Sequence, residues 1–434
     1  MKFLLLSALV LSISSLQASV TPTELVVKLK AGKALPDFGS DSKVQNLFGN
    51  IYIVRNKDVS SIEKQLKNNP NIEYTERNSR AEKSPLPMPV AASTEVEKSF
   101  KAAAFFNDPK VDKIWSFGDA DKNGVSVNAA YQVHGTSATS TVIVAVVDTG
   151  IDYTHEDLKD VLWVNEGEIP GNGIDDDANG YIDDVNGINT LTRDSEGRAT
   201  GNNKDTHSHG THVSGTIGAK QNNGIGIAGI ASNVKIIGIK TVPNSSDETD
   251  IDVAESFIYA AKNGAKIINC SFGKNKNEGK NLIPETLKYI QDNYGVLVIV
   301  AAGNSTADID KLPTYPASHK SDNLLIVAST TKTGSLSSFS NYGKVSVDVA
   351  APGSDVYSTT PGNRYASMSG TSMASPTTTG VAAEILSHYP NLSPIQLKQV
   401  IMDSVTTDVR YKDKMMTGGR IDLLKGLELA RSIK

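Results

Sequence analysis

Apolar and polar positions follow two patterns along the chain, and the first predicts a small α+β unit in residues 19–80. Residues 24–30 alternate between apolar and polar side chains as a half-buried strand does, and residues 50–54 form a second such segment. Residues 59–67 have helical spacing, and residues 72–76 predict a third strand. The unit is therefore expected to combine a short sheet with one helix.

The second pattern begins at about residue 105, where continuous apolar runs alternate with helical patterns. Continuous apolar strands separated by helices are typical of a parallel sheet that is covered on both faces. We therefore expect an α/β domain over residues 105–434. The predicted strands are 141–147, 234–240, 265–270, 295–302 and 324–328, and the predicted helices are 251–263, 284–294, 372–388 and 394–404.

Residues 81–104 differ in character from both units. Pro85, Pro87 and Pro89 and two short alanine-rich stretches are typical of an exposed linker. Proteolysis concentrates in such segments, so we expect a maturation cut here, at a bond that the sequence does not define.

The first 18 residues form a separate leader. Lys2 provides a short basic start, residues 3–13 are apolar, and Ala18 supplies the small residue of a cleavage site. The apolar run is shorter than the roughly 20 residues that a membrane span requires. We therefore expect a signal peptide in residues 1–18 and export to the medium or a periplasm, with no membrane partner.

Three short motifs place an Asp, a His and a Ser in that order, each where a predicted strand ends or a helix begins. They are VDTG at 147–150, HGTHV at 209–213 and GTSMA at 370–374. An acid, an imidazole and a hydroxyl are the parts that make a serine nucleophilic at neutral pH. Ser372 would open a helix, where free backbone N–H groups and the helix dipole stabilise developing negative charge.

Two histidines of the second motif, His209 and His212, compete for the role of base. Three residues apart, they share one face of a helix and could equally suggest metal ligands. A zinc protease would have Glu after the first His, and Gly210 stands there instead. The spacing alone does not choose between the two histidines.

Taken together, DTGID at 148–152, HGTHVSG at 209–215 and SGTSMASP at 369–376 resemble the subtilisin-like serine proteases, the subtilases. The resemblance implies a subtilisin-like α/β fold for residues 105–434. It also implies that residues 19–80 are a propeptide that assists folding and inhibits the enzyme until it is removed. The implied roles are orienting acid for Asp148, base for His209, nucleophile for Ser372 and oxyanion donor for Asn304.

The resemblance further implies two strands that bind an extended peptide substrate by β-augmentation. Phe272 stands where many relatives have Leu, so the wall of the pocket would differ in bulk. The implied substrate-binding residues are Ser271, Phe272 and Gly273 on one side and Ala301, Ala302 and Gly303 on the other.

Residues 175–184 (DDDANGYIDD) place oxygen donors at the spacing of a calcium-binding loop, with Gly180 at the sharp turn. The twelfth position is Asn186 rather than Glu, so the usual bidentate ligand is missing or comes from elsewhere. A solvated acidic loop is the alternative. The expected ligands are Asp175, Asp177, Asn179, the Tyr181 carbonyl and Asp183; the resemblance implies a second calcium site at Asp157, Asn223, Ile225 and Ile227.

Charge and cysteine content add two points. Residues 19–80 carry ten Lys/Arg and seven Asp/Glu, which gives them a net positive charge. Residues 81–434 carry a net charge of −9, and the whole chain carries −5. A basic propeptide on an acidic catalytic domain fits this imbalance, and chance explains it equally well. Cys270 is the only cysteine, so no intramolecular disulfide can form, and bound calcium is one other source of rigidity.

The sequence therefore predicts a secreted, calcium-stabilised serine endopeptidase, made as a zymogen, that cleaves protein or peptide substrates. Its own propeptide 19–80 is an expected partner, and the enzyme is expected to be a monomer. No basic stretch follows the spacing of a phosphate backbone, so nucleic acid is not an expected partner. The alternatives are a non-catalytic calcium-binding secreted protein on the same fold and a dedicated processing protease that cuts one partner.

Overall fold

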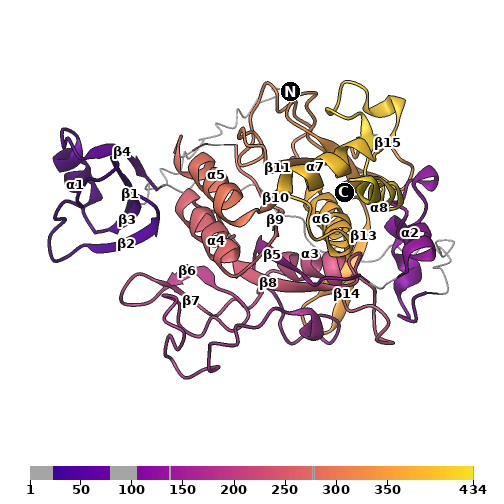
Figure 1. Ribbon diagram of the computed structural model, residues 1–434, viewed down its shortest axis with the longest axis horizontal. Helices are drawn as coiled ribbons and strands as arrows, with labels where there is room; N and C mark the ends of the chain where they lie inside the picture. Colours follow the sequence, from indigo (N-terminus) through magenta and orange to yellow (C-terminus); the bar gives the residue numbers. More distant parts are fainter. Residues whose placement is uncertain (1–22, 79–104, 136–137, 276, 278, 434) are drawn as a thin grey trace, which may run out of the picture.

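The computed structural model describes residues 23–78, 105–135, 138–275, 277 and 279–433 (Figure 1). The expected signal peptide (1–18) and linker (81–104) lie outside the described residues. Two units are present: a small front unit of residues 23–78, and a large body that follows it.

A ten-stranded sheet of order β15-β16-β12-β11-β10-β9-β5-β8-β6-β7 forms the centre of the body. Its middle strands are parallel to one another and almost wholly buried, which explains their continuous apolar sequences. All five predicted strands are confirmed there. They are β5 (Val142–Asp148), β8 (Val234–Lys240), β9 (Ile267–Cys270), β10 (Leu297–Ala301) and β11 (Leu324–Thr330).

The outer strands are short, and the hydrophobic pattern does not predict them. They are β12 (Val349–Pro352), β16 (Gly419–Arg420) and β15 (Thr406–Thr407) on one side, and β6 (Asn189–Arg193) and β7 (Ala199–Thr200) on the other. A separate antiparallel hairpin joins β13 (Val356–Thr360) to β14 (Arg364–Met368).

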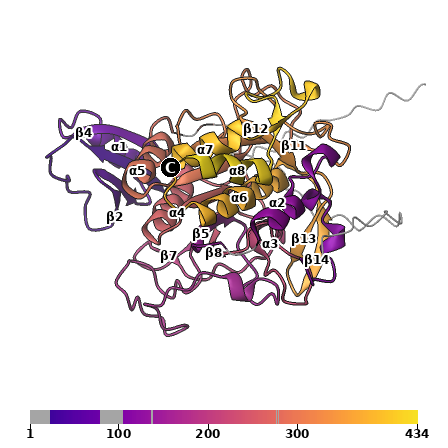
Figure 2. The same cartoon turned by 45° about the vertical axis from the view of Figure 1, so that its right-hand side comes forward.

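Helices cover both faces of the sheet (Figure 2). The alternation within β10 explains this: Leu297 and Ile299 belong to one apolar cluster, and Val298 and Val300 to another. One face is covered by α2 (Val127–His134), α3 (His209–Gly218), α6 (Thr371–His388), α7 (Pro394–Asp403) and α8 (Leu423–Ser432), and the other by α4 (Asp250–Lys262) and α5 (Leu282–Tyr294). The expected α/β class with helices on both faces is confirmed.

Local signals set the ends of these helices. Ser393 and Gln396 form a capping box at the start of α7, with Pro394 in its first turn. Gly295 ends α5 in the left-handed conformation at φ 66°, which a residue without Cβ adopts readily. Short 3-10 helices occupy Val111–Lys113, Trp115–Phe117, Ala120–Lys122, Lys159–Val161 and Val409–Tyr411.

The front unit is an antiparallel sheet of order β2-β3-β1-β4 with one helix packed on it. Its helix and three of its strands match the sequence prediction, and β2 was not predicted because only its last two residues are buried. One face has its own apolar core, which includes Val27, Val54 and Ile62. The elements are β1 (Glu24–Leu29), β2 (Lys43–Phe48), β3 (Ile51–Arg55), α1 (Val59–Leu66) and β4 (Ile72–Arg77).

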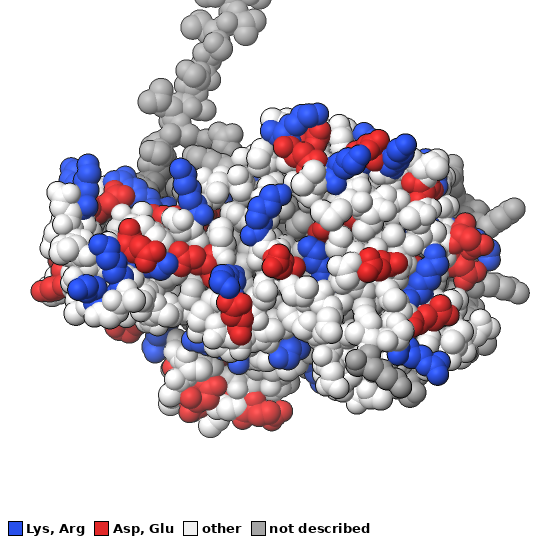
Figure 3. Space-filling view, turned by 45° about the horizontal axis from the view of Figure 1, so that its top comes forward, with Lys and Arg blue, Asp and Glu red and all other residues white. Residues whose placement is uncertain are grey.

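The other face of the front unit lies against α4 and α5, at the left of Figure 1. Val26, Ile51 and Ile53 share an apolar cluster with both helices, and the Phe48 and Tyr289 ring centroids lie 4.6 Å apart. Acidic and basic side chains are interspersed over the face of the molecule seen in Figure 3, which includes both units. Within the described residues, no helix is both long and apolar enough to cross a bilayer.

Candidate active site

The carboxyl ends of three neighbouring parallel strands provide the floor of the candidate site. Asp148 is the last residue of β5, Ser271 directly follows β9, and Asn304 follows β10 by three residues. Parallel strands end at the same edge of a sheet, which is where open α/β sheets assemble their sites. Two helices begin at this edge as well, α3 with His209 and α6 with Thr371.

Asp148 and His209 form a buried pair. His209 Nδ1 lies 2.7 Å from Asp148 Oδ1, and both side chains are almost fully buried. His209 Nε2 has no hydrogen-bond partner among the described residues. The carboxylate thus holds one ring nitrogen and leaves the other available, which is the arrangement that a general base requires.

His212 has a different environment. Its Nε2 lies 2.9 Å from the Val356 carbonyl oxygen and 3.1 Å from that of Ala366, on the two strands of the β13–β14 hairpin. Burial, followed by the neighbouring His209, lowers the pKa of His212 to about 3. A neutral ring fixed between two strands supports the fold and is poorly placed to exchange protons with a substrate.

Asp205, which the sequence analysis did not single out, joins the two motifs that carry the pair. Its buried carboxylate accepts hydrogen bonds from the hydroxyls of Thr149 (3.0 Å) and Thr211 (2.6 Å) and from the backbone N–H groups of Thr211, His207 and Ser208. Thr149 follows Asp148, and Thr211 lies in the first turn of α3. Asp205 therefore fixes the end of the strand relative to the start of the helix.

Ser372 is the second residue of α6. Its Oγ donates to the Ser271 carbonyl oxygen at 2.8 Å, and Ser271 Oγ donates back to the Ser372 carbonyl oxygen at 2.9 Å. The reciprocal bonds fix the helix start against the end of β9. At a helix N-terminus the backbone N–H groups are free to bind an anion.

Asn304 is held by the residue that precedes Ser372. Its Oδ1 accepts from the Thr371 backbone N–H at 2.8 Å and from the Thr371 hydroxyl at 2.9 Å. The side chain is exposed, and within the described residues its Nδ2 makes no hydrogen bond. The amide end of Asn304 is thus left as a free donor beside the start of α6. The sequence analysis missed Thr371 because a threonine there resembles an ordinary helix start.

The two expected substrate segments both lie close to Thr314. A Cβ added at Gly273 or at Gly303 would lie 3.3 Å or 3.5 Å from Thr314 Cγ2. Gly303 has a φ of +103°, and a Cβ there would also meet Asn341 Nδ2 at 2.4 Å, so a larger residue does not fit. The side chains of Ser271, Phe272, Ala301 and Ala302 are buried.

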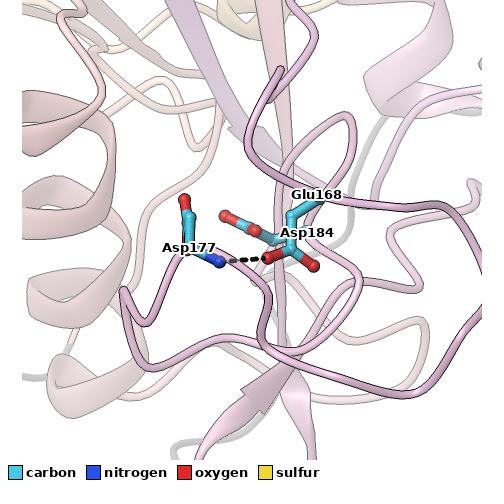
Figure 4. Close-up of side chains that lie close together, drawn as sticks. All are labelled: Glu168, Asp177 and Asp184. Atoms are coloured by element: carbon cyan, nitrogen blue, oxygen red, sulfur yellow. Dashed lines mark hydrogen bonds between the residues drawn. The ribbon is translucent and has the colours of Figure 1, made fainter.

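Three carboxylates from one loop region meet beside α4, and we call them the Glu168 cluster: Glu168, Asp177 and Asp184 (Figure 4). Their oxygen atoms lie within 4.8 Å of one another. Glu168 is 7% exposed, and its Oε2 is buried without a partner among the described residues. Burial raises the pKa values of Glu168 and Asp184. A hard divalent cation suits such a set of oxygen donors.

Only Asp177 of the five expected ligands belongs to this cluster. Asp183 accepts from the backbone N–H groups of residues 171–173, and Asp175 accepts from those of Asn179 and Gly180. Tyr181 contributes its ring to the packing beside α4. Glu168 and Asp184 are not among the expected ligands. Glu168 precedes the motif, and Asp184 does not belong to the series of every second residue from Asp175 to Asp183 on which the prediction was based.

The second expected metal group surrounds Asp157. Its Oδ1 accepts from Asn223 Nδ2 at 2.8 Å, and its Oδ2 accepts from the Ile227 backbone N–H at 2.9 Å and from the Tyr365 hydroxyl at 3.1 Å. Ile225 lies between these contacts, with its N–H on Asn223 Oδ1. The loop of residues 223–227 is thus wrapped around one buried carboxylate.

Fold and site together define a class of protein: an α/β domain with a mostly parallel central sheet, a buried Asp–His pair, a serine at a helix N-terminus and an amide donor beside it. Residues 139–419 match the model of the subtilase family. The chain belongs to the subtilase family.

Individual relatives agree with this assignment. The chain is 33% identical to subtilisin-like protease 1 of Plasmodium berghei (strain Anka), over 78% of this chain and 57% of the relative. It is 31% identical to a thermophilic serine proteinase of Bacillus sp. (strain AK1), over 90% of this chain and 84% of the relative. The chain spans about half the length of the Plasmodium relatives that it matches.

A solved structure is similar as well. A protease from Pseudoalteromonas arctica superimposes with a TM-score of 0.60 at 25% identity, over 75% of this chain and all of that one.

Proposed function

We propose that this protein is a serine endopeptidase that is exported as a zymogen and stabilised by calcium. The observation that carries the proposal is the 2.7 Å contact between Asp148 and His209, at the same sheet edge as Ser372 and Asn304. Membership of the subtilase family supports the same reading. A protein kept only for binding calcium would have no need of all four groups.

The reaction would begin when a peptide pairs with the backbone near Gly273 and Gly303. Ser372 Oγ then gives its proton to His209 Nε2 and attacks the peptide carbonyl carbon. Asp148 keeps Nδ1 protonated and stabilises the imidazolium that forms. Asn304 Nδ2 and the Ser372 backbone N–H would donate to the oxyanion.

The same groups would complete the cycle. His209 returns its proton to the leaving amine, and the amine departs with the first product. Water then loses a proton to His209 and attacks the acyl carbon; as the bond between that carbon and Ser372 Oγ breaks, His209 returns the proton to Oγ and the carboxylic acid product is released. The Asp148 carboxylate holds the ring in one tautomer throughout.

The front unit would inhibit this site until it is removed, as residues 19–80 were predicted to do. Its Glu76 accepts from the backbone N–H groups of Lys280, Asn281 and Leu282, at the start of α5. A carboxylate at this end of a helix offsets the dipole and satisfies free donors. The unit ends at Asn78, whose Oδ1 accepts from Ile251 N in the first turn of α4.

Asn78 is the last residue of the front unit that the structure describes, and its position relative to the candidate substrate strand can be traced through α4. Asp250 precedes Ile251 and forms an ion pair with Lys274 at 2.8 Å, and Lys274 follows Gly273. Asn78 therefore lies near the candidate substrate strand. This placement supports a front unit that delivers its own chain to the site.

Calcium would bind at the Glu168 cluster and beside Asp157, where it would serve as a structural cation. Glu168 Oε1 accepts from the backbone N–H groups of Asp176 and Asp177, whereas its buried Oε2 accepts no hydrogen bond from the described residues and could coordinate a cation. The remaining expected ligands Asp175, Asn179 and Asp183 would support the loop, since their oxygens accept its own N–H groups.

One experiment tests activity and processing together: N-terminal sequencing of the wild-type protein beside Ser372→Ala, with casein as substrate. Wild type is expected to lose the front unit by a cut within residues 81–104 and to digest casein, whereas Ser372→Ala does neither. A wild type as inert as the variant after removal of the front unit would contradict the proposal. A peptide library of which only a few members are cut would indicate a dedicated processing protease.

A further inference from the structure

Glu255 of α4 lies where three parts of the molecule meet. The residue is 1% exposed, and its carboxylate contacts the front unit, the β6–β7 hairpin and the loop that carries the Glu168 cluster. No catalytic residue contacts it in the described part of the chain. Its surroundings therefore need an explanation other than catalysis.

The front unit reaches Glu255 with two side chains. Gln45 Nε2 donates to Glu255 Oε1 at 3.1 Å, and Arg55 Nη2 lies 3.8 Å from Glu255 Oε2. Arg55 is oriented within its own unit, because its Nε donates to Glu24 at 2.8 Å and its Nη1 to Gln45 Oε1 at 2.7 Å. A fixed guanidinium beside a buried carboxylate is a specific docking contact.

Two residues of the body contact the same carboxylate, and we call Glu255 together with these residues, Arg193 and Tyr181, the socket. Arg193 of β6 donates to Glu255 Oε2 and, at 2.7 Å, to Asp252. The Tyr181 hydroxyl donates to Glu255 Oε1 at 3.4 Å. Tyr181 lies within the acidic loop, and Arg193 follows that loop, so the position of residues 168–193 determines the shape of the socket.

The Glu168 cluster contacts the same helix one turn further along. The Tyr259 hydroxyl donates to Asp184 Oδ2 at 2.6 Å, and Tyr259 stands four residues after Glu255 on one face of α4. The rings of Tyr181 and Tyr259 pack edge to face with centroids 5.0 Å apart. Two tyrosines thus connect the carboxylates of Figure 4 to the socket that receives Arg55.

We propose that a divalent cation at the Glu168 cluster and the front unit bind cooperatively, each strengthening the other through Tyr181, Tyr259 and Glu255. The inference rests on the proposed cation site and the proposed propeptide. Without a cation, three carboxylates within 4.8 Å repel one another and loosen the loop. The front unit must then order Tyr181 and Arg193 as it docks. With a cation, the socket is already formed.

Linkage requires the effect to be reciprocal. A docked front unit must raise the cation affinity by the same factor by which the cation raises the affinity of the front unit. Removal of the front unit during maturation would therefore weaken cation binding at this site and leave the Asp157 group unaffected.

Terbium luminescence, excited through tyrosine, measures the coupling on the full chain in the Ser372→Ala background. The part of the signal lost in Asp184→Asn is assigned to the Glu168 cluster, which separates it from a signal at Asp157, where Tyr365 is adjacent. Arg55→Ala is expected to weaken terbium binding at the cluster by about fivefold or more, the usual lower range of such couplings. The matched control is Lys43→Ala, which removes a different ion pair between the units, with Glu196.

A second variant, Tyr259→Phe, tests the coupling without changing any residue of the front unit, so its result does not depend on how well the Arg55→Ala protein docks. Tyr259→Phe keeps the ring and removes the hydroxyl, so it should reduce the fraction of front unit that co-elutes with the body after the linker is cut with trypsin in calcium. In EGTA, the parent should show the same reduction. Equal terbium affinity in the parent, Arg55→Ala and Lys43→Ala would overturn the coupling. A parent signal that Asp184→Asn does not change would instead overturn the cation site itself.

Discussion

Asn304 Oδ1 accepts two hydrogen bonds from Thr371, one from its backbone N–H and one from its hydroxyl. Thr371 also accepts, at its Oγ1, a bond from the Gly303 backbone N–H at 3.1 Å. The residue before Ser372 and the residue before Asn304 are thus tied through one hydroxyl. Asn304, the proposed oxyanion donor, and Ser372, the proposed nucleophile, are therefore held at a fixed separation.

Replacing Asn304 by Ala should lower kcat by about 10²–10³-fold, because one oxyanion donor contributes about 2.7–4 kcal/mol. KM should change little, since the donor acts on charge that develops only in the transition state. Thr371→Val should lower kcat less, because the backbone bond to Asn304 remains. Steady-state kinetics with a peptide substrate measure both, and an unchanged kcat in Asn304→Ala would rule out its role.

Asp205→Asn should reduce kcat by roughly 10–100-fold with KM nearly constant, because a small displacement of the Asp148–His209 pair is costly to catalysis. An amide nitrogen cannot accept the bonds that the carboxylate takes from Thr149 and Thr211. A variant that only loses stability, with normal kcat at low temperature, would show that Asp205 supports the fold alone.

The losses of activity caused by His209→Ala and by Ser372→Ala should not be additive. Residues that act as one unit lose nearly all their contribution when either is removed, so the double variant should be about as inactive as each single one. His212→Asn is the informative control, because its ring is bound between strands. That variant should melt at a lower temperature while retaining measurable turnover. Complete inactivity of a folded His212→Asn protein would contradict the assignment of the base.

The buried carboxyl group of Glu248 should make the free energy of unfolding decrease as pH rises. Burial raises its pKa to about 7, and its Oε1 has no partner among the described residues. Because the folded pKa lies above that of the unfolded chain, near 4.3, the contribution is full below about pH 4 and is lost as pH passes 7, amounting to up to about 3 kcal/mol.

The measurement compares thermal melting of Ser372→Ala with that of Ser372→Ala/Glu248→Gln. The two should melt together near about pH 4, and the Gln variant should melt several degrees higher near about pH 9. Glu428→Gln, at an exposed position, is the control and should show no such divergence. Parallel melting curves at both pH values would refute a buried, uncharged Glu248.

Chelation should lower the melting temperature of the Ser372→Ala protein. A cation present at about 1,000 times its dissociation constant stabilises the folded state by about 4 kcal/mol. Asp184→Asn should remove part of the calcium effect and Asp157→Asn another part, as read by melting in calcium and in EGTA. If calcium shifts all three proteins equally, neither carboxylate binds it.

The long central strands could be predicted from sequence because burial on both faces makes them continuously apolar. Val142–Asp148 and Val234–Lys240 are examples. Two-residue strands such as Gly419–Arg420 leave no such signal, since neighbouring strands and not local pattern determine them. The Lys43–Phe48 strand was missed because only its last two residues are buried, so it shows no alternation of apolar and polar positions.

The site divides in a similar way. Asp148, His209 and Ser372 stand in distinctive motifs, whereas Asp205, Thr371 and the residues of the Glu168 cluster outside the motif act through contacts that only the folded chain creates. Which of the two histidines, His209 or His212, is placed to act as the base also depends on contacts in the folded chain. His212 is defined by carbonyl oxygens more than a hundred residues away in the chain.

The order of elements along the chain has a consequence during synthesis. The front unit, with its own apolar core, is made first, and the helices α4 and α5 on which it docks follow. Ser372 opens α6, which is made only after both. Ser372 is therefore synthesised after the front unit and after both of the helices that contact it, so the surface on which the front unit docks is complete before the proposed nucleophile is added.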